Sequence, residues 1–398
     1  MTVAGKVLAV GSGLSANGRW VFMKGREPVL VRDGGFSFDR VPATYDVWVA
    51  NEDRGNISIY EGVTRRDPVL WHSTYYMPGL DEAPQRGTIT GILRGDFPFP
   101  VELGYLVTIY YVAEGAQAVI QVGRYSASGG PRFGPIAVEW YGGPSITGNL
   151  VAVAEHATKD KRWAKAFLAS TPLSLTSGEK ATAELKLAPV PTGRIAGSID
   201  TDGLDMVREI YFTYQVPKAK GQLDVLHCKV YKTYDCELPD LRSLGGEYCA
   251  SINFAYPFGE PTVEARKCGG KIGMTDFSFH VGGPPRFQGK SATVSKDGVL
   301  AWTDKEKGVY MVKLGPDWHT PKAPHLEIFT SETQIRWPDF EALGVTLPVG
   351  AKFRCQVSRL SPYASVDDLA SWRGRGLSRS ATDFQKVDSA PIEVTVEE

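Results

Sequence analysis

The sequence lacks the features that mark membrane-spanning and nucleic-acid-binding proteins. No stretch approaches the ~20 consecutive apolar residues of a membrane-spanning helix. The 44 Lys and Arg residues balance the 45 Asp and Glu residues to a formal net charge of −1, so no overall field attracts nucleic acid or an anionic membrane. The basic stretch 157–167 resembles a solvated strand edge, because charges there keep sheet edges from pairing with other chains. We therefore expect no transmembrane segment and no nucleic-acid partner.

The sequence also lacks the spacings that mark common catalytic sites. Its six histidines form neither H-E-x-x-H nor H-x-H, and no G-x-S-x-G elbow is present. The glycine-rich segment 11–18 follows a short strand and precedes no helix, so no helix dipole faces an anion there. We expect no catalytic residue, no cofactor and no enzymatic activity.

A calcium loop is only partly represented. The segment DTDGLD offers alternating carboxylates, but Tyr211 stands where a twelve-residue loop needs its distal bidentate Glu. A hairpin turn at Asp202 and Gly203 explains the segment more simply, so we expect no metal. If calcium does bind, its ligands are Asp200, Asp202 and Asp205.

The composition favours short strands joined by tight turns. The chain contains 43 Gly and 26 Pro residues together with many Val, Thr, Tyr and Trp residues. Its 398 residues exceed what one hydrophobic core supports, and domains of about 100–150 residues imply three or four units. These properties predict an all-β chain of tandem antiparallel sandwiches, arranged as a rod or a compact string.

A repeated opening strand divides the sequence into modules. The segments VAGKVLAV, RGTITGIL and TGRIAGSI each place a small residue before and inside an alternating apolar strand. A proline-rich joint, PVPTG, precedes the third of these modules. The predicted domains are 1–78, 79–190, a cysteine-containing domain at 191–287, and 288–398.

Two families share these patterns. The opening G-x-V/I-x-G strand and the later G-x-F-x-F-x-x-V-P-x-x-Y-D-V segment resemble the carboxypeptidase regulatory-like, transthyretin-like seven-stranded sandwich over residues 1–75, 85–190 and 191–287. The last domain, with Trp302 in an early strand and an alternating strand from Lys352 to Ser358, resembles a fibronectin type III-like, Ig-like sandwich. The segment IYEGVTRRDPVLW is similar to segments of secreted or lipid-anchored bacterial modular proteins.

These resemblances imply a non-catalytic bacterial cell-surface or secreted protein. Carboxypeptidase regulatory-like modules accompany other activities, so the implied role is structure, adhesion or partner binding, with surface or envelope proteins or glycans as partners. One alternative is a carbohydrate-binding protein that uses exposed aromatic rings. Another is a self-associating subunit of a fibre or shell.

Clustered aromatic residues are the candidate ligand-binding residues, because flat rings beside polar groups grip sugars and extended peptides. The candidates are Trp71, Tyr75 and Tyr76 in a linker, and Trp140 and Tyr141 beside a glycine turn. The competing interpretation is that these rings fill the seams between modules.

Cysteine placement indicates the compartment. No C-x-x-C knuckle occurs, so two disulfides among Cys228, Cys236, Cys249 and Cys268 are favoured over a zinc site, with connectivity left open. Disulfides imply an oxidising compartment, so we expect an extracellular, periplasmic or outer-surface protein whose leader has been removed. Cys355 alternates with core residues and is expected to be a buried free thiol.

Overall fold

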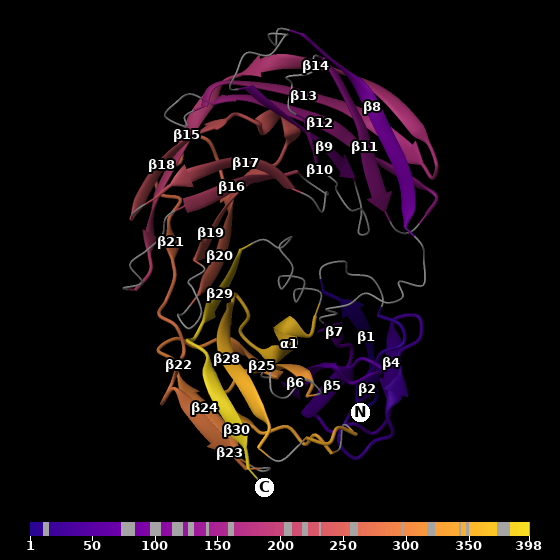
Figure 1. Cartoon of the computed structure of the whole chain (residues 1–398), viewed down its shortest axis with the longest axis vertical. Coiled ribbons are helices and arrows are strands. Elements are labelled where there is room, and N and C mark those ends of the chain that lie inside the picture. The colour runs from indigo at the N-terminus through magenta and orange to yellow at the C-terminus, as the bar shows by residue number, and fades with distance from the viewer. Residues whose placement is uncertain are drawn as a thin grey trace.

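A computed structural model shows a chain built from strands joined by turns (Figure 1). It describes residues 1–10, 16–72, 84–95, 105–113, 122–125, 131–140, 143–157, 163–202, 209–216, 222–230, 232–254, 262–295, 298–316, 323–341, 344–347, 350–371 and 383–397. Within these ranges, helical structure comprises α1 (Val366–Leu369) and a 3-10 turn, η2 (Arg242–Leu244). The predicted all-β fold class is confirmed.

The first segment holds β1 (Val3–Ala9), β2 (Trp20–Phe22), β3 (Val29–Leu30), β4 (Gly35–Phe38), β5 (Tyr45–Ala50), β6 (Asn56–Val63) and β7 (Val69–His72). The second holds β8 (Gln85–Gly95), β9 (Tyr105–Ala113), β10 (Val122–Tyr125), β11 (Arg132–Trp140), β12 (Ser145–Ala157), β13 (Trp163–Thr176) and β14 (Lys180–Val190).

The third segment holds β15 (Thr192–Asp200), β16 (Glu209–Gln215), β17 (Gln222–Lys229), β18 (Thr233–Pro239), β19 (Glu247–Phe254), β20 (Val263–Gly270) and β21 (Phe279–His280). The remaining strands are β22 (Arg286–Phe287), β23 (Ser291–Val294), β24 (Val299–Thr303), β25 (Val309–Pro316), β26 (His325–Thr330), β27 (Gln334–Arg336), β28 (Lys352–Ser361), β29 (Phe384–Asp388) and β30 (Ile392–Val396).

The first three segments open with the same three-stranded arrangement. The opening strand of each segment lies between an antiparallel neighbour and a parallel strand near the end of the segment. The three orders are β4-β1-β7, β11-β8-β14 and β18-β15-β21. The repeated opening motif of the sequence therefore corresponds to a repeated structural element.

A glycine in each opening strand lies opposite an aromatic residue of the antiparallel neighbour. The pairs are Gly5 with Phe36, Gly91 with Phe133, and Gly197 with Tyr234. An added Cβ at these glycines would lie 2.6, 2.1 and 2.4 Å from the carbonyl oxygens of Pro68, Ala183 and Phe277, respectively. The motif requires glycine because neighbouring backbone occupies the position of a side chain.

The first and last segments share one sheet. β6 pairs in parallel with β26, which joins β5 and β2 to β25 and β28 in a 14-stranded sheet. In Figure 1 the N-terminal strands accordingly lie beside the C-terminal ones. Two hydrophobic cores draw residues from both segments: Val47 and Tyr60 pack with Met311 in one, and Ile57 packs with Val312 in the other.

The structure therefore differs from the expected rod or string of separate sandwiches. β26 pairs with the edge of β6. This pairing joins residues more than 250 positions apart, and no local pattern in the sequence encodes it. The second and third segments also share a core, where the Tyr110 hydroxyl donates to the Asp224 carbonyl at 2.9 Å. The predicted boundaries and family resemblances of the segments stay predictions.

Two local predictions in the last segment, the strand position of Trp302 and the buried thiol of Cys355, are confirmed. Trp302 is buried in β24, and Cys355 is a buried free thiol in β28, where burial raises its pKa. Ser365 caps α1 by accepting a hydrogen bond from the backbone N–H of Asp368.

Candidate functional site

The two described tryptophans among the predicted ligand-binding residues are buried. Trp71 and Trp140 are each 1% exposed, so the prediction that their rings face solvent is wrong. The Trp71 indole donates to the Ser371 carbonyl at 2.9 Å and so fills a seam between the first and last segments. Trp140 packs in the core of the second segment and donates to the Gly143 carbonyl at 3.0 Å. The other candidates, Tyr75, Tyr76 and Tyr141, lie outside the described residues.

The carboxylates of the calcium candidate make local contacts. Asp200 accepts hydrogen bonds from the Asp202 backbone N–H at 3.3 Å and from the His280 ring at 3.0 Å. These two contacts, in that order, lower the pKa of Asp200. Asp202 adopts a positive φ of 44°, consistent with a turn, and Asp205 lies outside the described residues. The expectation that no metal binds here, with these carboxylates as the ligands if calcium does bind, stays untested.

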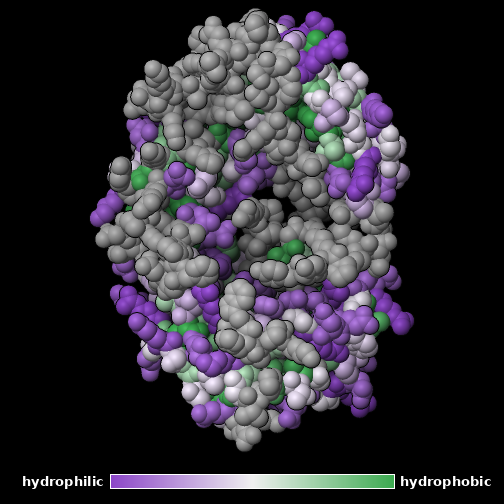
Figure 2. Space-filling model, viewed as in Figure 1, coloured by the Kyte–Doolittle hydropathy of each residue, from purple (hydrophilic) through white to green (hydrophobic). Residues whose placement is uncertain are grey.

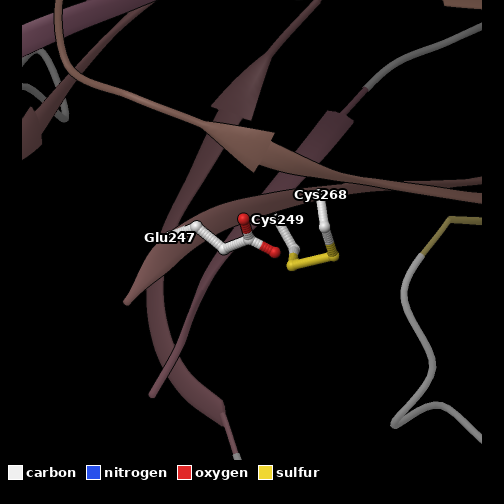
Figure 3. A group of neighbouring side chains, drawn as sticks. All are labelled: Glu247, Cys249 and Cys268. Carbon is white, nitrogen blue, oxygen red and sulfur yellow. A yellow bond between two sulfur atoms is a disulfide. The ribbon is translucent and has the colours of Figure 1, made fainter. Parts of the chain in front are cut away.

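Both predicted disulfides are present. Cys228 is bonded to Cys236, and Cys249 is bonded to Cys268. Figure 3 shows the second bond beside Glu247, whose carboxylate lies within 4.8 Å of both sulfur atoms. Because each sulfur is bonded to the other, neither is a thiolate ligand, and this cluster does not hold a metal in the disulfide form.

The first segment contains a buried hydrogen-bonded Ser–His–Asn arrangement that was not predicted from the sequence. Ser58 Oγ lies 2.8 Å from His72 Nδ1, and His72 Nε2 lies 2.9 Å from Asn51 Oδ1. With Asn51 presenting an acceptor, Nε2 carries the ring proton and Nδ1 accepts from the serine hydroxyl. The sequence signal was faint: a polar residue in an apolar strand and another at a strand end.

The Ser58–His72–Asn51 arrangement resembles a catalytic nucleophile, base and orienting group, but its role is structural. Burial, and secondarily the positive charge of Arg19, lower the pKa of His72 to about 3. A base that weak takes no proton from serine near neutral pH. Ser58 is also 1% exposed. We conclude that the hydrogen bond between Ser58 and His72 serves to link β6 to β7.

A polar groove lies on the sheet shared by the first and last segments. One core covers one face of β28, β25, β26 and β6, and a second core covers part of the opposite face. The rest of that face carries two cross-strand rows, Gln356–Lys313–Glu327–Ser58 and Arg354–Gly315–His325–Asn56. These rows line a cavity of about 450 Å³, within the range of small-molecule sites.

Charge in the groove is arranged around a glycine. Lys313 and Glu327 form an ion pair at 3.2 Å in one row. In the other row, the exposed side chains of Arg354 and His325 lie on strands that flank Gly315. A Cβ at Gly315 would lie 3.5 Å from His325 Nδ1, so the missing side chain leaves a depression there. The groove therefore brings amide and charged side chains together around this depression.

No family model and no curated protein matches the sequence. Among solved structures, the fimbrial anchor protein Mfa2 from Porphyromonas gingivalis aligns at 10% identity over 43% of this chain and 78% of that chain, with a TM-score of 0.20. A fimbrial assembly protein from Parabacteroides distasonis aligns at 8% identity over 46% and 96%, with a TM-score of 0.20. The TIE protein from Bacillus anthracis aligns at 12% identity over 89% and 62%, with a TM-score of 0.17. At these scores the alignments carry no functional argument.

Proposed function

We propose that this chain is a non-catalytic, exported bacterial protein that binds a partner through the groove on its shared sheet. The proposal rests on the way the groove is built, from β6 of the first segment together with β25, β26 and β28 of the last segment. The first and last segments must therefore fold together to form it.

Two disulfides in the third segment support the exported location. Structural disulfides persist in oxidising compartments and are rare in the reducing cytosol. This supports a secreted, periplasmic or cell-surface protein. Within the described residues, no helix is long and apolar enough to cross a membrane.

The groove favours ligand binding over the assembly of a fibre or shell. Within the described ranges, Val299 is the large hydrophobic residue that is exposed, at 50%. On the face shown in Figure 2, hydrophobic residues form small separate patches. Among the residues that the structure describes, no broad apolar face supports self-association, whereas amide and charged groups converge in the groove.

The test is a binding screen with a groove variant and a matched surface variant. Purified neutral and acidic polysaccharides and peptides are immobilised and probed with the wild type, Lys313→Ala/Gln356→Ala, and the control Lys305→Ala/Gln288→Ala, whose residues are exposed outside the groove. We expect a ligand that the wild type and the control bind and the groove variant does not. Absence of any ligand, or equal binding by all three proteins, would contradict the proposal.

A further inference from the structure

The disulfide between Cys249 and Cys268 lies beside a carboxylate in the third segment. Glu247 and Cys249 are two residues apart on β19, so their side chains lie on the same face of the sheet. On β20 a bulge sets Cys268 and Gly269 opposite Cys249, and Gly269 has a positive φ of 89°. The Glu247 carboxylate lies beside the two sulfur atoms (Figure 3), and the three groups are within 4.8 Å of one another. Two adjacent strands thus bring three metal-ligating groups together.

Backbone pairing holds this arrangement in place independently of the disulfide. β19 and β20 pair on both sides of the bulge, and β19 also pairs with β16 while β20 also pairs with β29. The backbone N–H of Cys268 donates a hydrogen bond to the Asp383 carboxylate at 2.8 Å. Breaking the bond between the sulfur atoms therefore frees the sulfurs and leaves the strands paired.

Reduction converts the two sulfur atoms into metal ligands. A dithiol reductant exchanges with the disulfide, so that the reductant becomes a disulfide and Cys249 and Cys268 become thiols. A divalent metal ion then displaces one proton from each thiol, because the thiolate is the form that binds a metal. Two thiolates and one carboxylate are ligands that suit Zn²⁺, and a water molecule completes the four-coordinate shell.

The size, exposure and charge of the cluster suit zinc. Bonds of about 2.0–2.3 Å place the ligand atoms of tetrahedral zinc about 3.3–3.8 Å apart, so shifts of about 1–2 Å suffice here. Cys249 is fully buried, whereas Cys268 and Glu247 are partly exposed, so a metal can enter from solvent. The three negative charges of the ligands are balanced by Zn²⁺ and by the guanidinium of Arg266, which is buried on β20 two residues before Cys268.

From this arrangement we propose that Glu247, Cys249 and Cys268 form a redox-controlled zinc site, which is blocked while the disulfide is present and binds Zn²⁺ once the disulfide is reduced. β19 and β20 are then cross-linked in both redox states, by the disulfide under oxidising conditions and by the metal under reducing conditions. The site lies in the third segment and does not depend on the groove between the first and last segments.

The experiment titrates Co²⁺, a spectroscopic substitute for Zn²⁺, into the full chain before and after reduction with a phosphine. We expect no binding by the oxidised chain. The reduced chain should bind one Co²⁺ with the ultraviolet charge-transfer absorption of cobalt–thiolate bonds, and added Zn²⁺ should displace the Co²⁺. Zn²⁺ should also raise the melting temperature of the reduced chain, because a metal held by folded strands stabilises the folded state.

Matched variants of the reduced chain assign the ligands. Glu247→Gln should weaken Co²⁺ binding at least about tenfold, because one of the three protein ligands is lost. Glu264→Gln, which changes a partly exposed carboxylate on β20 outside the cluster, should leave the affinity unchanged. Cys249→Ser/Cys268→Ser should abolish binding.

The other disulfide controls for non-specific binding to thiols. Cys228→Ser/Cys236→Ser should bind Co²⁺ as tightly as the wild type once both are reduced. Loss of binding in this variant, no binding by the reduced wild type, binding by the oxidised chain, or equal affinities of Glu247→Gln and Glu264→Gln would each overturn the inference. Far-ultraviolet circular dichroism follows folding: a reduced wild type that unfolds must refold with Zn²⁺, and one that stays unfolded would also overturn it.

Discussion

The first and third segments open with the same three-stranded element but complete their cores differently. In both, a glycine lies under an aromatic ring of the antiparallel neighbour and beside a carbonyl near the parallel closing strand. The third segment adds its own strands β16, β17, β19 and β20, two disulfides and a shared core with the second segment. The first segment relies on β25, β26 and β28 from the far end of the chain.

This difference teaches that the opening motif specifies a local strand arrangement and not the neighbour that finishes the core. A three-stranded sheet with one apolar face needs another layer to exclude water. In the third segment that layer is cross-linked by disulfides and paired with β29 of the last segment, and in the first segment the last segment supplies the pairing strand without disulfides. Only the second solution builds the groove.

We expect the largest loss of folding stability from substitutions in the opening element that the first and third segments share. Gly5→Ala and Gly197→Ala should each lower the free energy of unfolding by about 3 kcal/mol, because a methyl group must displace backbone. Gly143→Ala is the matched control, since nothing lies within 4 Å of its added Cβ. Urea denaturation measures all three, and a Gly197→Ala cost as small as that of Gly143→Ala would show that the two elements are not equivalent.

The second-largest loss of stability should affect the third segment and leave the first segment unchanged. Cys249→Ala/Cys268→Ala removes a bond between residues 19 positions apart and should lower the stability of the third segment by about 2–3 kcal/mol. Hydrogen exchange followed by peptide-level mass spectrometry should show faster exchange in β16 to β20 and unchanged exchange in β5, β6 and β26. Equal acceleration in both regions would mean that they unfold as one unit.

Acid should weaken the first segment through His72. Its pKa is about 3 when folded, against an ordinary value of 6.5, so the unfolded state binds more protons below pH 6.5. The contribution of the neutral histidine is complete above pH 6.5 and is lost as the pH falls toward 3, by about 2 kcal/mol between pH 7 and pH 5. His72→Gln should remove this part of the pH dependence of the free energy of unfolding, which urea denaturation at each pH measures. An unchanged slope in the variant would contradict the burial of a neutral ring.

The smallest effect has the opposite sign and lies on β6. Burial raises the pKa of Glu61 to about 7, partly offset by a hydrogen bond from Thr330. Its contribution to stability is present below the ordinary value of 4.5 and is lost as the pH rises through 7, by about 1 kcal/mol between pH 5 and pH 6. The wild type should therefore lose stability relative to Glu61→Gln over that interval, as measured by chemical denaturation. A wild type that gains stability relative to Glu61→Gln as the pH rises from 5 to 6 would refute the raised pKa.

The sequence predicted the elements whose signal is local. Alternation and glycine placement indicated the opening strands at Gly5, Gly91 and Gly197, and cysteine clustering indicated the disulfides. The Ser365 cap followed from side-chain chemistry. Each of these depends on residues close together in the chain or on a residue type with one dominant role.

The candidate site was not predictable because its parts are distant in the sequence. Ser58 and Glu327 become neighbours only through the pairing of β6 with β26, and no periodic pattern encodes that pairing. The aromatic candidates failed for a related reason: Trp71 lies in what reads as a linker, yet Ser371 accepts its indole hydrogen bond from 300 residues away. Polar residues that alternate with core residues look the same on an open face as in a groove.

The most direct test of the account is native-state hydrogen exchange of β6 and β26 under increasing denaturant. If the first and last segments form one body, the amides of Ile57–Tyr60 and Leu326–Phe329 should be protected and should lose protection together, with one opening free energy. Independent opening of β6 while β25, β26 and β28 stay protected would show that the segments fold separately and that the groove is not an integral part of the fold.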